Sequence, residues 1–280
     1  MWAEFKHTLR RMRGQIIGWS IGVGLYSLLM VFLYPTVTGI EDLTALYGSF
    51  PEEMMVFFGD IMMLNTPRGY LDTYFFSYMQ IIIGILAIST GASMVTGDEE
   101  KGILDLILAH PVSRTALFWG RLLGLAVVLL IVLLVGWLCW AIPAEQVELG
   151  LSWIELLRPF LPLFAVLLLF GTIALFLSML LPAGRMAGML TGALLVGNFL
   201  LAGLSQISED LEPAMDLTPL AYYQDGQAVE GLNWGWLAGL LAAGLVLALA
   251  AWLLFRRRDI RVGGERTWKL PRLIPRRARS

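Results

Sequence analysis

The sequence is short of charge, of cysteine and of histidine, and each shortage excludes a class of protein. Asp, Glu, Lys and Arg make up 15% of the 280 residues, against about 25% in an average soluble domain. The single cysteine, Cys139, cannot form a disulfide within the chain and excludes a cysteine-rich metal site. The two histidines, His7 and His110, lie outside the long apolar runs, so the sequence offers no Ser/His pair for an intramembrane hydrolase.

A nucleotide-binding loop is missing as well. The sequence contains no Gly-x-x-x-x-Gly-Lys-Ser/Thr segment, the loop whose backbone cradles the phosphates of ATP. We therefore expect no catalytic residue in this chain and no enzymatic activity of its own. A function driven by ATP would need hydrolysis on a separate chain, which would also hold the nucleotide and Mg²⁺.

Apolar residues are abundant instead, and they predict an all-α membrane protein. They make up 58% of the chain, and the mean hydropathy is +0.72. They gather in blocks of roughly 20 residues, the length that a helix needs to cross a hydrocarbon core of about 30 Å. The first, third and fourth blocks stop at Pro35, Pro143 and Pro182. Six spans are predicted, at about 15–34, 74–96, 115–142, 159–181, 186–204 and 234–255, in one membrane domain over 1–255 that a basic tail over 256–280 follows.

The charged residues separate by sign, which predicts the orientation. Lys and Arg accumulate on the cytoplasmic side of membrane proteins. With both termini in the cytoplasm, that side receives the basic N-terminus, the segment 97–114, Arg121, Arg185 and the whole tail, and only Arg68 and Arg158 fall outside. The outer segments, including 36–73 and 205–233, collect carboxylates instead. We predict a short outer helix around 54–64, and Pro213 and Pro219 should break up the segment 205–233.

The first 14 residues have the pattern of an interfacial helix. Apolar residues recur there at spacings of three and four, and Lys6, Arg10 and Arg13 occupy the other face. Such a helix lies in the headgroup layer with its basic face toward anionic lipid; a disordered basic tail is the alternative. Glycines also recur at four-residue spacing, which lets helices approach closely within the chain or between two copies. These sets are Gly14, Gly18 and Gly22; Gly120 and Gly124; Gly184, Gly188 and Gly192; and Gly231, Gly235 and Gly239.

The charged segment 97–114, between the second and third spans, is the most informative part of the chain. The spacing predicts a helix over about 99–109 with an apolar stripe. Its acidic residues, Asp98, Glu99 and Glu100, lie at its N-terminal end, where carboxylates meet the helix dipole favourably. Pro111 should end this helix, and Ser113 should cap the third span. Such a segment fits a groove on a partner protein or, alternatively, is an amphipathic connector resting on the membrane.

The same segment resembles the signature of type-2 ABC exporter permeases. The run Glu99-Glu100-x-Gly102-Ile-Leu104-Asp105, continued through leucines to Pro111-Val-Ser113-Arg114 and then Gly120-Arg121, is similar to the family's pattern. Ile103, Asp105 and Arg121 stand where the family usually has Thr, Glu and Lys. The motif covers about 25 residues, and the order of the spans around it also agrees with the family.

The resemblance implies the membrane subunit of a bacterial ABC exporter. Two six-span permeases would pair, as a homodimer or a heterodimer, above two ATPase subunits in the bacterial cell membrane. ATP binding would move the coupling helix and switch the path by alternating access. The resemblance assigns contact with the ATPase to Glu99, Glu100, Gly102, Leu104, Asp105, Pro111, Ser113 and Arg114.

The polar residues inside the spans bear on the substrate. Gln80 and Asn198 are candidates to line a substrate path, with a hydrogen bond between helices as the alternative. The predicted span interiors hold no ionisable group, which argues against an ion-coupled secondary transporter. They suit an amphipathic or lipid-like substrate, such as a drug, an antibiotic or a lipid, and hence a role in multidrug resistance. A membrane scaffold or sensor with the same partner is the other alternative. The composition of the basic tail favours an anchor near anionic lipid over a nucleic-acid site.

Overall fold

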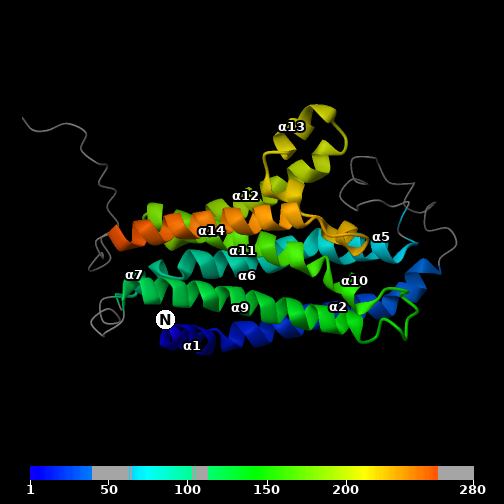
Figure 1. Cartoon of the computed structure of the whole chain (residues 1–280), viewed down its shortest axis with the longest axis horizontal. Coiled ribbons are helices and arrows are strands. Elements are labelled where there is room, and N and C mark those ends of the chain that lie inside the picture. Colours follow the sequence, from blue (N-terminus) through cyan, green and yellow to red (C-terminus); the bar gives the residue numbers. More distant parts are fainter. Residues whose placement is uncertain (40–62, 64, 103, 105–112, 258–280) are drawn as a thin grey trace, which may run out of the picture.

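The structure is a computed structural model of the whole chain, and all its described elements are helical (Figure 1). It describes residues 1–39, 63, 65–102, 104 and 113–257. The outer helix predicted around 54–64 and the basic tail beyond Arg257 lie outside these residues, except for Met63. So do Asp105 and Pro111 of the coupling motif.

Six helical stretches are long and apolar enough to cross a membrane, which confirms the six predicted spans. Short turns extend two of them. Pro67–Leu71 (α5) and a π-helical turn at Asp72–Phe76 (η2) lead into α6, and Trp153–Leu157 (α10) leads into α11. The main helices are α2 (Arg13–Thr38), α6 (Ser77–Ser93), α9 (Arg114–Ala141), α11 (Phe160–Leu180), α12 (Gly184–Ser205) and α14 (Trp234–Arg257).

Two prolines shape the ends of the first two spans. Pro35 was expected to end the first span, but α2 continues through it to Thr38, whose hydroxyl donates to the Tyr34 carbonyl over 2.8 Å. Pro67 starts a helix instead, because its fixed φ suits a first turn that needs no N–H donor. The preceding Thr66 caps that turn by accepting from the Gly69 amide. The second span therefore begins about seven residues earlier than Tyr74, where the prediction placed it.

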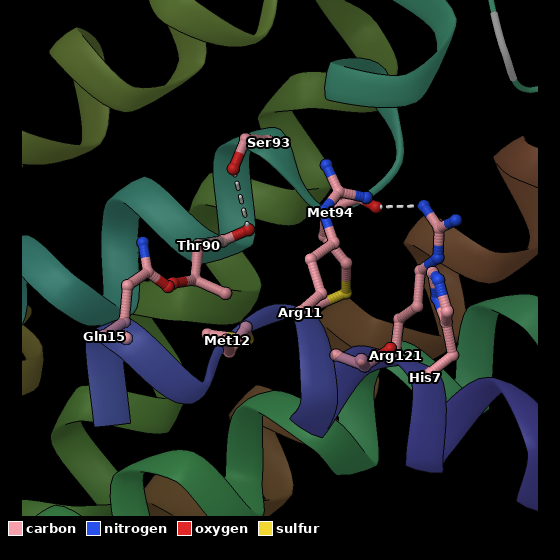
Figure 2. Close-up of a pocket in the computed structure, with 10 residues that line it drawn as sticks. His7, Arg11, Met12, Gln15, Thr90, Ser93, Met94 and Arg121 are labelled. Carbon is pink, nitrogen blue, oxygen red and sulfur yellow. Dashed lines mark hydrogen bonds between the residues drawn. The ribbon is translucent and has the colours of Figure 1, made fainter. Parts of the chain in front are cut away.

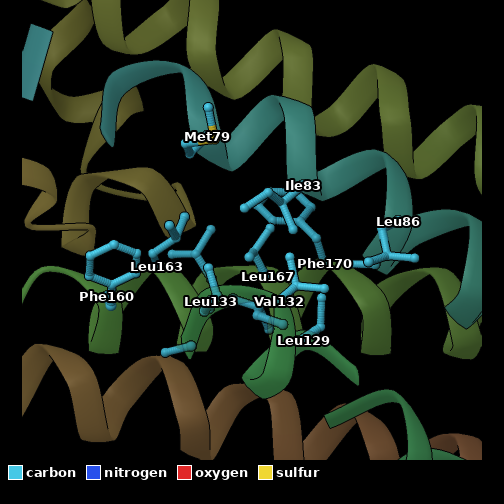
Figure 3. Packing of buried hydrophobic residues seen from close by; sticks show 14 of the residues in the cluster. Met79, Ile83, Leu86, Leu129, Val132, Leu133, Phe160, Leu163, Leu167 and Phe170 are labelled. Atoms are coloured by element: carbon cyan, nitrogen blue, oxygen red, sulfur yellow. The ribbon is translucent and has the colours of Figure 1, made fainter. Parts of the chain in front are cut away.

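The helices α6, α9 and α11 form the centre of the bundle. In Figure 1, α11 lies between α14 and α9, and it packs against α6, α14, α12 and α9. Of the most apolar stretch of the α10–α11 span, 67% is buried, against 22% in α2 and 22% in α12. Large buried side chains of the three central helices interdigitate there (Figure 3), among them Ile83, Val132 and Leu167. The outer faces of α2, α12 and α14 carry exposed Leu, Ile, Val and Met, as expected for surfaces that face lipid.

The backbones of α6 and α11 touch directly at two glycines. A Cβ atom added to Gly91 would lie 2.1 Å from the Gly171 carbonyl oxygen, which is far inside van der Waals contact. Only glycine allows this approach, and it brings the two central helices closer than side chains would permit.

Aromatic residues fasten one end of the bundle. We call the end that holds Tyr70, Phe75, Phe76, Trp140 and Phe160 the aromatic end; all five are buried. The Phe75 ring lies 5.7 Å from Trp140 and 5.7 Å from Phe160, within the range of favourable ring pairs. The Tyr70 hydroxyl donates to the Met30 carbonyl on α2 over 2.7 Å. The sequence predicts that this end faces outward.

The segment between α12 and α14 is broken into short turns, as its prolines predict. These are η3 (Glu209–Leu211), α13 (Glu212–Met215), η4 (Pro219–Tyr222) and η5 (Asp225–Val229). The last turn closes over the aromatic end. The Tyr223 hydroxyl donates to the Phe76 carbonyl over 3.1 Å, and the Gly226 amide donates to Asp72 Oδ1 over 2.9 Å.

The N-terminal segment forms α1 (Trp2–Arg11), separated from α2 by a break at Met12. The helix predicted there is therefore present, and it packs against the first turns of α9. A Cβ at Gly124 would lie 2.6 Å from the Thr8 side chain, and one at Gly120 would meet Glu4 and the Met1 carbonyl. The close approach predicted for this glycine pair is confirmed, with α1 as the partner. A position of α1 in the headgroup layer stays a prediction.

Candidate functional site

The coupling motif lies at the opposite end of the bundle from the aromatic rings. We call this the junction end: it holds α7 (Thr96–Glu100), the first turns of α9, the first turn of α12 and the last turn of α14. Figure 1 shows α7 and the start of α9 beside the end of α14. The sequence predicts that this end is cytoplasmic.

The helix predicted over 99–109 does not form as one piece. The helix α7 ends at Glu100, and Gly102 follows with φ 67°. This left-handed conformation ends helices, and glycine adopts it without a steric penalty. The helix therefore stops where the motif places its glycine. Leu104, just beyond, is 2% exposed and belongs to the hydrophobic core.

Asp98 is the centre of a buried charge cluster. Its side chain is fully buried and lies 2.8 Å from the Arg11 guanidinium on α1 and 2.6 Å from the Arg121 guanidinium on α9. Arg121 is itself 4% exposed and also donates to the Met94 carbonyl. Burying a carboxylate is costly unless cations and hydrogen bonds compensate it, and here two arginines do so. Asp98 thus joins α7 to α1 and α9 instead of facing the dipole of its own helix.

Arg121 lies at the junction end, the side on which the charge pattern placed it, but two turns inside α9 and among buried apolar residues. The prediction that the span interiors hold no ionisable group is therefore wrong at this position. One signal was available: an isolated arginine inside an apolar run needs an acidic partner, and the carboxylates at 98–100 lie on the same predicted side. No pattern in the sequence indicates that Asp98 is the one used or that Arg11 shares it.

Glu100 interacts with the start of a different span. Its Oε1 accepts a hydrogen bond from the Gly184 amide, the first residue of α12, over 3.1 Å. The carboxylate therefore meets a helix dipole favourably, as predicted for this acidic group, but the helix is α12 and not its own. Gly184 permits this approach, because a Cβ there would lie 2.4 Å from the Thr96 hydroxyl. Glu99 lies beside Glu100 on α7 and is half-buried.

Ser113 and Arg114 connect α9 to α14. The Ser113 hydroxyl accepts from the Ala116 amide over 3.1 Å, which confirms its predicted capping role. The Arg114 guanidinium donates to the Phe255 carbonyl over 3.3 Å and lies 6.0 Å from the Phe255 ring centre. An arginine at the last carbonyls of a helix satisfies acceptors that have no partner within that helix. Arg114 is thus a link to the final span.

A cavity of about 450 Å³ adjoins this charge cluster. Figure 2 shows side chains of α1, the start of α2, α6 and α9 around it. Arg11 and Arg121, which hold Asp98, both line it.

The two residues proposed for a substrate path lie apart from the junction. Gln80 is buried on α6, and its amide nitrogen donates to the Ser77 carbonyl over 3.2 Å. Asn198 is half-buried on α12 and donates to the Leu194 carbonyl over 2.8 Å. Both bonds stay within their own helices, so the alternative of a bond between helices is not formed. Neither side-chain oxygen has a hydrogen-bond partner among the described residues, and the role in a path stays a prediction.

Comparison with known proteins connects this geometry to a family. The sequence profile of the ABC-2 family transporter proteins matches residues 12–260, which include all six spans and the whole coupling motif. A comparison with curated proteins gives no match.

Proposed function

We propose a function for this chain on the premise that it belongs to the ABC-2 family of transporter proteins and is a multi-pass membrane component of a transporter. It is the permease subunit of an ATP-driven exporter in a bacterial cell membrane. A separate ATPase subunit binds the coupling segment 97–114 and carries the ATP and Mg²⁺. Its cycle switches the transmembrane path between inward-facing and outward-facing states.

The convergence of helix ends at the junction is the observation that carries this proposal. Asp98 holds α1 and α9, Glu100 holds the start of α12, and Arg114 holds the end of α14. All three residues lie within the predicted coupling segment. A displacement of that segment by a partner would therefore act on several spans at once, which is what a coupling element requires.

Two such subunits would enclose the substrate path. The helices α2 and α12 bury only 22% of their most apolar stretches within one chain, which leaves broad apolar faces for lipid or for a second permease. The substrate would be amphipathic or lipid-like, because Gln80 and Asn198 offer hydrogen-bonding oxygens among apolar walls. The ionisable groups buried at the junction are already paired with one another.

Site-specific cross-linking tests the docking role. Cys139 is the single cysteine, so a Cys139→Ser chain is a clean background. A cysteine at Leu106, in the predicted coupling segment, should cross-link to the partner ATPase, whereas a cysteine at Ser208, near the opposite end of α12, should not. Cross-linking from Ser208 alone would contradict the proposal.

Reconstituted vesicles test the transport itself. The chain alone should hydrolyse no ATP, and vesicles containing it with the ATPase should move an amphipathic dye only when ATP is supplied. Docking without ATP-driven movement of any amphipathic probe would instead favour a scaffold or sensor. Robust hydrolysis by the purified chain would overturn the assignment of ATP to a partner.

A further inference from the structure

The cavity at the junction end carries a net positive charge. Arg11 and Arg121 share the single carboxylate of Asp98, so two positive charges face one negative charge. Among the residues that the structure describes, no acidic residue lines the cavity itself. Three exposed cations, Lys6, Arg10 and Arg13, add to the local potential from α1 and the start of α2. An anion with a single negative charge would balance the cluster.

Hydrogen-bond donors remain available around this cavity. The Arg11 side chain is 44% exposed, and one of its guanidinium nitrogens is engaged with Asp98, so further N–H groups can reach an anion. The Thr90 hydroxyl lines the cavity and has no hydrogen-bond partner among the described residues. His7 and Gln15 also line it and are exposed. This set of cationic, hydroxyl and amide groups suits the oxygens of a phosphodiester.

An open strip without side chains leads away from the cavity along α2. Gly14 lines the cavity, and Gly18 and Gly22 continue from it on one face of the helix. A Cβ added to any of the three would meet no atom within 4 Å. The stripe runs for roughly 12 Å along the helix, and exposed Ile17 and Ile21 flank it. An acyl chain can lie along such a strip, whereas a free phosphate ion would make no use of it.

We propose that this cavity binds the headgroup phosphate of an anionic phospholipid from the bilayer, with one acyl chain along Gly14, Gly18 and Gly22. Such a lipid would bridge α1, α2 and α6 next to Asp98. The site does not depend on the proposed export of a substrate, because it requires only that the junction end reaches the headgroup layer.

The test measures lipid retained by the purified full chain. The protein is exchanged into detergent with phosphatidylglycerol or phosphatidylcholine, and bound lipid is counted by native mass spectrometry. Wild type should retain phosphatidylglycerol about tenfold more strongly than phosphatidylcholine, as expected for a charge-assisted contact. Equal retention of the two lipids would overturn the proposal.

Two variants separate the headgroup from the acyl chain without touching the ion pairs. The double variant Gln15→Leu, Thr90→Val removes neutral polar groups and should lower the retention of phosphatidylglycerol severalfold. Gly18→Leu should place a side chain on the glycine strip and weaken retention of both lipids. Gly239→Leu on α14 is its matched control, because that glycine is equally exposed and open, and it should retain lipid like wild type.

Further arms distinguish the source of the phosphate and detect misfolding. If inorganic phosphate or glycerol phosphate raises the thermal unfolding midpoint as much as phosphatidylglycerol does, the site takes a free anion and the lipid proposal is wrong. Variants are compared only when their midpoints in lipid-free detergent equal that of wild type. If the double variant fails this criterion, two experiments still test the proposal. They are the comparison of the two lipids on wild type and the comparison of Gly18→Leu with Gly239→Leu.

Discussion

The two ends of the bundle are fastened by different chemistry. At the aromatic end, five large rings are packed at centre distances near those of favourable aromatic pairs, and tyrosine hydroxyls donate to backbone carbonyls of neighbouring helices. At the junction end, a few charged side chains bridge helix ends: Asp98 to two arginines, Glu100 to α12 and Arg114 to α14.

This difference indicates where the protein can rearrange. Close-packed rings lose contact with any displacement, so they favour one arrangement. Arginines and carboxylates on helix ends can exchange one partner for another, and such interfaces switch between discrete states. We therefore expect the aromatic end to stay fixed and the junction end to change when a partner binds.

Breaking the charge cluster is the largest expected effect. Asp98→Ala leaves Arg121 buried without its carboxylate and should destabilise the protein by about 3–5 kcal/mol. Thermal unfolding in detergent, followed by fluorescence, measures the loss. Glu145→Ala, which removes an exposed carboxylate, is the control. Asp98→Leu combined with Arg121→Met should recover most of the stability, and failure of Asp98→Ala to lower the midpoint would contradict the role of the cluster.

Removing a ring tests the other end. Phe75 is fully buried between Trp140 and Phe160, so Phe75→Ala should cost about 3 kcal/mol or somewhat more through lost contacts and a cavity. The stability loss caused by Phe75→Ala should not change when Arg11 or Arg121 is replaced, whereas the loss caused by Asp98→Ala should. The double variant Phe75→Ala, Arg11→Gln should show the sum of the two single effects. A strong coupling between them would show that the two ends are not independent.

Equivalent helix caps at the two ends should have equal, smaller effects. Ser113 caps α9 at the junction end, and Ser152 caps α10 near the aromatic end in a reciprocal pair with Glu155. Each Ser→Ala change should cost about 1 kcal/mol. Similar midpoint shifts would locate the difference between the ends in the charge cluster and the rings; unequal shifts would show that capping contributes to it.

The smallest expected effect is a pH dependence next to the aromatic end. Burial, and then the nearby carboxyl of Asp72, raise the pKa of Asp225 well above its usual range, and Arg68 opposes this rise. The folded state therefore holds this proton more tightly than the unfolded chain. Its contribution to stability is full below the ordinary carboxyl pKa of about 4 and is lost as the pH rises above that value.

Asp225→Asn tests that contribution. The variant should have a higher unfolding midpoint than wild type at pH 7, and the gain should disappear near pH 4. Glu145→Gln, at an exposed site, should show no such difference. A variant that is less stable than wild type at pH 7 would show that the charged form of Asp225 is the one that the fold requires.

Local patterns could be predicted from the sequence, and contacts between distant segments could not. The six spans follow from apolar run length, and the Ser113 cap follows from a contact three residues away. The Gly120 and Gly124 spacing predicted a close approach but not its partner, α1. The contact of Glu100 with Gly184 joins residues 84 positions apart, and no periodicity encodes such a pairing. The end of α7 could have been predicted from Gly102, because a glycine after the last helical turn commonly adopts the left-handed conformation seen there.

The contact between Gly91 and Gly171 limits how the subunit can move as a mechanism. Two helices whose backbones touch cannot slide past or turn around each other without a collision, so α6 and α11 behave as one strut. The junction residues instead contact α1, α9, α12 and α14, which lie outside this pair. Spin labels on α6 and α11 should keep their separation through an ATP cycle while a label on α12 moves relative to both. We therefore expect α6 and α11 to move as one rigid body and the helices around them to rotate relative to it.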